Sequence, residues 1–203
     1  MAKKKKEAVE AATDAVVAEL TQEKPLLIVQ GTLNDEFCNY GIQINTGPTK
    51  GMIHMVKGKP NIVHEDLSDA FQKFRPHLAA LSNAYDWSGI ELNNFQDVTE
   101  NQLVDLFHVT GFKIKGAGEA ESIALFGSYH SMTANGRVNA DTDFISLEEG
   151  SDYQWYNELR EAADLVRSEI EQYNNGKCTP PPESEQVDKK QLSIVDAIAE
   201  EQD

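Results

Sequence analysis

The 203-residue chain lacks the features that would mark a membrane span, a metal site or a disulfide framework. No stretch of 18 apolar residues is present, so no transmembrane helix is predicted. Two cysteines, Cys38 and Cys178, form no CxxC pair and match no zinc-binding spacing. The opening MAKKKKEAVEAATDAVVAEL begins like a signal peptide, but acidic residues interrupt any apolar core. We therefore expect a protein of the cytoplasm with no disulfide and no membrane partner.

The motifs of common enzyme chemistry are also missing. The sequence has no GxSxG and no Walker loop, and its five histidines form no HExxH or HxH pair. The one GxG, at Gly116 and Gly118, follows a predicted strand but precedes no helix, which is typical of a hairpin turn. Asp141 and Asp143 could together hold a cation, but no further ligand accompanies them. We predict a non-catalytic protein without a cofactor.

Positive charge is scarce overall and unevenly placed. The chain carries 18 Lys and Arg against 34 Asp and Glu, a net charge of −16. Residues 141–171 alone hold ten carboxylates against two arginines. By contrast, residues 41–64, GIQINTGPTKGMIHMVKGKPNIVH, hold three lysines and no carboxylate, and residues 107–118 are also free of acid. This segregation indicates that one part of the surface is less negative than the rest.

The hydrophobic pattern predicts an α+β domain. Apolar runs or alternation with a period of two, separated by Gly, Pro and Asn turns, predict strands near 26–29, 37–44, 52–57, 107–115 and 122–131. An Asn-Gly turn at 135–136 suggests a sixth strand. A period of three and four predicts two main helices, about 64–83, where Pro76 is a candidate kink, and 153–173.

The same pattern predicts the domain organisation. We expect a polar, basic N-terminal tail (1–24), a single domain (25–176), and a Pro-containing linker with an acidic C-terminal tail (177–203). The element order matches an antiparallel sheet of five to six strands on two helices. An OB-like barrel, which often binds single-stranded nucleic acid, has this order. An open curved sheet of no named type has it as well.

If the barrel forms, the acid-free windows fall on its binding face. Single-strand binders combine a cationic groove with exposed aromatic rings on which bases stack. Lys113 and Lys115 are two residues apart in a strand and therefore share a face. Tyr40, His54 and Tyr129 are candidate stacking platforms, and packing in the core or at a sheet edge is the competing reading for each. The full predicted nucleic-acid site is Lys50, Lys57, Lys59, Lys73, Arg75, Lys113, Lys115, Tyr40 and His54.

Three strings in the sequence carry a family resemblance. They are VHEDLSDAFQKFRPHLA, VTGFKIKGAGEAESIALFGSYH and YNELREAADLVRSEIEQYNNGK. Through them the chain resembles small uncharacterised proteins encoded by tailed bacteriophages and prophages, over roughly residues 25–178. The resemblance implies a phage origin and the bacterial host cytoplasm. It favours a role in phage DNA metabolism, assembly or evasion of host defence, and it carries over no site residues.

Two functions remain open from the sequence. The first is an accessory protein of phage replication or recombination that binds single-stranded DNA. In this case the acidic tail, with apolar Leu192, Val195 and Ile198, would recruit phage or host replication proteins. The second is an acidic interaction module, either a host-defence inhibitor or a DNA mimic, that binds through the acidic helix 153–173 and the tail; its distinguishing feature is the carboxylates of 141–171. A minor virion protein is a further alternative.

Overall fold

In the computed structural model, the described residues are 26–34, 37–58, 63–82, 84, 94–116 and 120–178. Most of both predicted tails therefore lies outside them, including Leu192, Val195 and Ile198. The strands are β1 (Leu26–Leu33), β2 (Cys38–Ile44), β3 (Ile53–Val56), β4 (Phe107–Lys115), β5 (Ser122–Ser131), β6 (Gly136–Asp141) and β7 (Ile145–Ser146). The helices are α2 (Glu65–Gln72), α3 (Arg75–Leu81), α4 (Phe95–Thr99), the 3-10 helix η1 (Gln102–Leu106) and α5 (Tyr156–Asn174).

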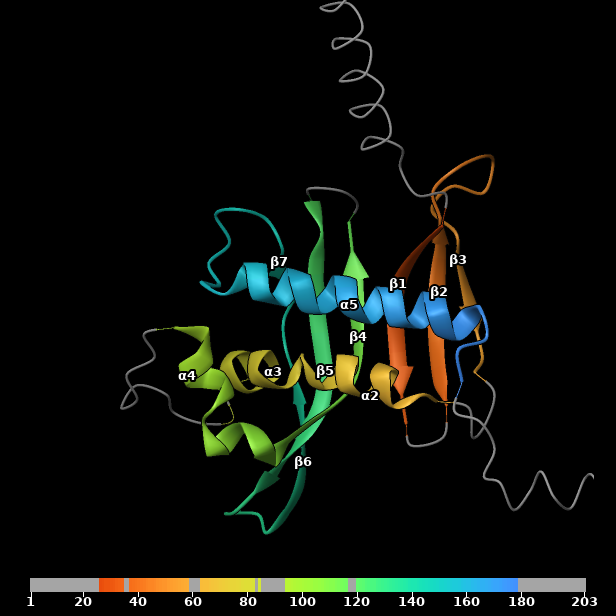
Figure 1. Ribbon diagram of the computed structural model, residues 1–203. Coiled ribbons are helices and arrows are strands. Elements are labelled where there is room, and N and C mark those ends of the chain that lie inside the picture. Colours follow the sequence, from red (N-terminus) through yellow and green to blue (C-terminus); the bar gives the residue numbers. More distant parts are fainter. Residues whose placement is uncertain are drawn as a thin grey trace, which may run out of the picture.

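All seven strands belong to one antiparallel sheet, which confirms the predicted α+β class. The strand order is β3-β2-β1-β4-β5-β6, and β7 pairs with β5. Helices α2, α3 and α5 run across the strands on the same face of this sheet (Figure 1). No helix among the described residues is long and apolar enough to cross a membrane.

Of the two architectures that the sequence left open, the structure has the open sheet, and an OB-like barrel does not form because the sheet does not close. Closure requires a strand of the second half to pair back onto β3. The outer edge of β5 is already occupied, since β6 pairs with it over residues 126–131 and β7 over residues 122–123. Strands β3 and β6 therefore lie at opposite ends of the order rather than side by side.

The predicted helix at 64–83 is two helices. α2 ends at Gln72, and α3 begins at Arg75 with Pro76 in its first turn. Proline has no backbone N–H, so it cannot bond to the Gln72 carbonyl and continue the first helix. At the other end, the His64 Nδ1 atom accepts a hydrogen bond of 3.2 Å from the Asp66 backbone N–H and caps α2.

The core lies between the helices and the sheet. One stripe of α5, with Leu159, Ala163, Val166 and Ile170, is fully buried against it. From the sheet, Phe112 packs against Phe71 and Phe74, with ring centroids 5.8 and 5.7 Å apart. Burial of this stripe explains why the C-terminal helix forms, since a helix is stabilised mainly by packing of its apolar face.

A mostly buried ion pair connects α5 to the strands. The Arg167 guanidinium donates two hydrogen bonds of 2.9 Å to the Glu121 carboxylate. Its Nε donates a third, of 3.0 Å, to the Ile28 carbonyl. The side chains of Arg167 and Glu121 are only 11% and 13% exposed. Because Glu121 directly precedes β5, this contact sets the position of the β4–β5 hairpin beneath the helix.

Candidate nucleic-acid interface

The sheet face opposite the helices carries every charged side chain of the seven strands. The strands contain only four such residues, three basic and one acidic. All four are exposed, while their strand neighbours Phe112, Ile114 and Ala140 are buried on the helix side. Side chains in a strand alternate between faces, so the charged residues share the other face. We call it the open face, and its charged residues are Lys113, Lys115, Arg137 and Asp141.

A row of residues crosses the open face from β3 to β5. The pairing aligns Met55 with Gly41, Gly41 with Gln30, Gln30 with Lys113, and Lys113 with Ala124. The Gln30 Nε2 atom donates a hydrogen bond of 2.6 Å to the Met55 sulfur. With about 4.8 Å between strands, the row extends about 19 Å. Lys113 thus lies near the middle of a broad surface with little negative charge.

Two phenylalanines flank the lysines on the open face. The Lys115 Nζ atom lies 3.9 Å from the centroid of the Phe144 ring, and Phe144 is 38% exposed. Phe126 alternates with the buried Leu125, so it projects from the open face, where its partners in register are Gly111 and Asp141. Gly111 has no side chain to cover that flank of the ring. Neither ring was among the predicted site residues, although the alternation in SIALFGSYHS marks Phe126 as outward-facing.

The predicted cationic residues do not all converge on this face. Lys113 and Lys115 lie on it, whereas Lys50 lies in the β2–β3 turn and Lys57 directly follows β3. Lys59 is outside the described residues. The last two predicted cations, Lys73 and Arg75, belong to the helix layer, where Arg75 pairs with Asp105 at 3.6 Å.

The three aromatic candidates, Tyr40, Tyr129 and His54, do not form stacking platforms on the open face. Tyr40 is 2% exposed, and its hydroxyl donates a 2.5 Å hydrogen bond to Asn174 Oδ1, so it is a core residue. Burial also raises the pKa of Tyr40. The Tyr129 ring stacks on Phe107 at 5.4 Å in the core. His54 is exposed, but its place in register opposite Ile42 puts it on the helix side of β3.

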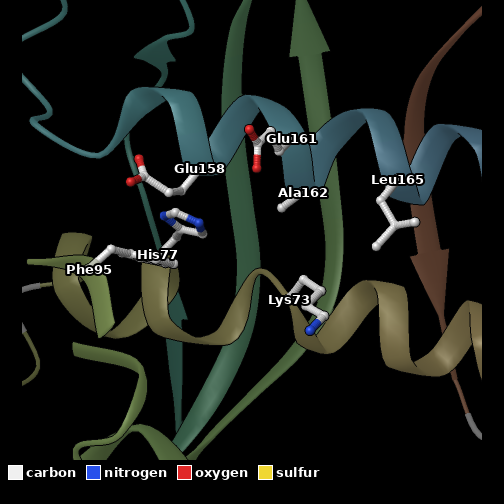
Figure 2. Close-up of a pocket in the computed structure, with 7 residues that line it drawn as sticks. All are labelled: Lys73, His77, Phe95, Glu158, Glu161, Ala162 and Leu165. Carbon is white, nitrogen blue, oxygen red and sulfur yellow. The ribbon is translucent and has the colours of Figure 1, made fainter. Parts of the chain in front are cut away.

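A separate cavity of about 330 Å³ lies in the helix layer between α3, α4 and α5 (Figure 2). Glu158, Glu161 and Leu165 line it from α5, and Lys73 and His77 lie on the opposite wall. A second cavity of about 430 Å³ adjoins it and shares Lys73 and Phe95. The charges along the two walls are mixed, so the cavities present no cationic groove.

His77 in that wall is a packing residue. It is 1% exposed, its Nδ1 atom lies 2.8 Å from the Tyr153 hydroxyl, and its ring stacks on Phe95 at 4.5 Å. Burial lowers the pKa of His77 to about 3, although a hydrogen bond with the Glu158 backbone works in the opposite direction. With a pKa this low, His77 is a weak base, whereas acid–base catalysis works best with a pKa near the working pH.

The candidate cation ligands Asp141 and Asp143 are both exposed, at the end of β6 and in the loop that follows it. Within the described ranges, no three His, Cys, Asp or Glu side chains lie close enough together to hold a metal ion. Burial raises the pKa of the Cys38 thiol to about 12, so it is an unreactive core residue.

The fold and the site define a class: an α+β protein with helices on one face of an open antiparallel sheet and a weakly cationic opposite face. Comparisons with family models, curated proteins and solved structures found no match. The resemblance to phage proteins therefore stays a prediction.

Proposed function

We propose that the protein is a non-catalytic binder of single-stranded nucleic acid and that the open face is its binding surface. The observation that carries the proposal is the sign of the charge on that face. The strands contribute three basic side chains and one acidic side chain to it, in a chain whose net charge is −16. An exposed basic surface on an acidic protein is where a polyanion meets the least repulsion.

The chemistry of the face supports a single strand rather than a duplex. Lys113, Lys115 and Arg137 can neutralise phosphates, and Phe126 and Phe144 offer rings on which unpaired bases can stack. Neutral hydrogen-bonding side chains occupy the neighbouring positions, where they can bond to base edges. They include Gln30, Gln43, Asn39, Ser128 and Asn139. An open sheet also suits a single strand, whose unpaired bases can be splayed onto its surface.

The affinity for an oligonucleotide should fall as salt is raised, and the steepness of that fall should report the number of phosphate contacts. For single strands, log K falls with log salt by about 0.7 for each phosphate neutralised. Three contacts give a slope of about −2, or about a 20-fold loss of affinity between 50 and 200 mM salt. Fluorescence anisotropy with a labelled 20-nucleotide oligo-dT measures both the affinity and the slope.

A pair of matched double variants tests whether the open face is the binding surface. Lys113→Ala with Lys115→Ala should reduce affinity at 50 mM salt and lower the slope to about −0.7, as expected for one remaining contact. Lys73→Ala with Arg75→Gln removes the same charge from the helix layer and should change neither. The proposal fails if the wild-type chain does not bind oligo-dT at 50 mM salt, or if both double variants lose affinity for it to the same extent.

The acidic outer surface of α5 favours a second candidate function, an interaction module for a basic protein surface. Glu161 and Asp164 are exposed there, next to Leu165, which is 40% exposed. A module that mimics DNA would displace a labelled duplex from a DNA-binding protein. Glu161→Arg with Asp164→Arg should abolish that displacement without weakening oligo-dT binding, and unchanged displacement would argue against this candidate.

A further inference from the structure

Strand β3 lies at one end of the strand order of the sheet. It pairs with β2 on one side, and no other strand of the described residues pairs with it (Figure 1). The Ile44 N–H donates to the Met52 carbonyl at 3.0 Å, which places Ile44 in a hydrogen-bonded pair. Continuing the register, His54 and Val56 bond inward to β2. The backbone N–H and C=O groups of Ile53 and Met55 therefore point outward.

This edge lacks most of the features that usually prevent pairing with another chain. Natural edge strands are blocked by charged side chains, proline or bulges. β3 is short, but it contains no charged residue and no proline. Its outward-bonding residues are also exposed and apolar, Ile53 at 48% and Met55 at 62%, and Met52 beside them is 53% exposed. Such an edge is a template for an added strand.

A cavity beside the edge can accept a side chain from an added strand. It has a volume of about 370 Å³ and lies on the helix side of the strand end. An added strand would place alternate side chains on the open face, beside Ile53 and Met55, and on the helix side, beside this cavity. Specificity in strand addition comes from pockets of this kind. The lining residues include Val56, Lys57, Gly58, Tyr173, Gly176 and Cys178.

The charge around the edge selects the partner. Residues 41–64 contain no Asp or Glu, and lysines flank the strand at positions 50 and 57. An antiparallel pair of two copies of β3 would bring Lys57 of one copy next to Gly51 and Lys50 of the other, so like charges disfavour self-pairing. An acidic segment would instead gain from both lysines.

We propose that the outer edge of β3 binds an extended segment of another protein that has apolar residues at alternate positions and acidic flanks. The segment adds a strand to the sheet, and one apolar side chain enters the cavity beside Val56. The charge pattern of residues 41–64 is then explained by this partner, separately from the nucleic-acid proposal, which rests on Lys113 and Lys115.

The test uses the full chain and a labelled synthetic peptide, EDVTVTVED, in fluorescence anisotropy. Met55→Pro removes an outward N–H without touching the bonds to β2, and it should weaken binding at least ten-fold. Met55→Ala, the matched control, loses the same side chain but keeps the N–H, and it should bind within three-fold of wild type. The peptide KKVTVTVKK should bind at least ten-fold more weakly than the acidic one.

The folded state of each variant is checked by circular dichroism, and Ile53→Pro replaces Met55→Pro if the latter does not fold. The proposal is overturned if the acidic peptide does not bind, or if the proline and alanine variants at position 55 lose affinity equally. It is also overturned if light scattering shows a dimer that Met55→Pro dissolves, because a second copy then occupies the edge.

Discussion

The Arg167–Glu121 contact allows a sharp prediction about stability. Arg167→Met leaves the Glu121 carboxylate, only 13% exposed, without its two 2.9 Å hydrogen bonds, and leaves the Ile28 carbonyl without its donor. Breaking a buried pair by removing one partner costs 3–5 kcal/mol, and the residual exposure places this one near about 3 kcal/mol. With a urea m-value of about 2 kcal/mol/M, the unfolding midpoint should fall by about 1.5 M.

The double variant separates the ion pair from simple loss of packing. Glu121→Met alone should cost about 2 kcal/mol, because Arg167 keeps its bond to the Ile28 carbonyl and lies 3.6 Å from Asp164. Combining it with Arg167→Met removes both charges, so the pair should cost about 2 kcal/mol in total rather than the sum of about 5. Urea titrations followed by tryptophan fluorescence give all three values. If the losses of unfolding free energy in the two single variants add up to the loss in the double variant, the contact is not a coupled ion pair and the reasoning is refuted.

Three further predictions concern other sites. Because the folded-state pKa of His77 is about 3, below the unfolded value of 6.5, its contribution to stability is complete above pH 6.5 and is lost as pH falls. Unfolding should therefore cost about 2 kcal/mol less at pH 5 than at pH 7.5, and urea midpoints of His77→Gln should not show this difference. Replacing Phe126 and Phe144 by Leu should weaken oligo-dT binding about ten-fold or more with an unchanged salt slope, since stacking contributes about 1–3 kcal/mol per base; an altered slope would contradict this role. Under native conditions a thiol reagent should modify one cysteine per chain, the exposed Cys178, and rapid modification of Cys38 would contradict its burial.

Periodicity alone predicted most of the local structure. The alternation of Phe112 and Ile114 with Lys113 and Lys115 placed the two lysines on one face, and the structure has them there. The period of the last helix predicted a buried stripe along 153–173, and α5 buries it. These predictions succeed because side-chain direction within one strand or helix follows from local backbone geometry.

Periodicity could not predict whether the sheet closes or whether the cationic side chains come together in space. Whether β5 pairs with β3 or with β6 and β7 depends on contacts between segments far apart in the chain, and each pairing satisfies the same local pattern. Tyr40 was a candidate platform because it is an aromatic residue in a predicted strand, but the strand pattern does not say which face the helices cover. The burial of Tyr40 is set by the end of α5, where Asn174 bonds to it.

The sequence by itself determined the α+β class, the two helical regions, the shared face of Lys113 and Lys115, and the scarcity of acid in residues 41–64. Only the tertiary structure decided that the sheet stays open, that Phe126 and Phe144 flank those lysines, and that the outer edge of the acid-free hairpin pairs with no other described strand. The physical reason is the distance along the chain over which the deciding interactions act. Strand and helix periods are properties of neighbouring residues, whereas exposure of a face or an edge depends on which distant segments pack against it.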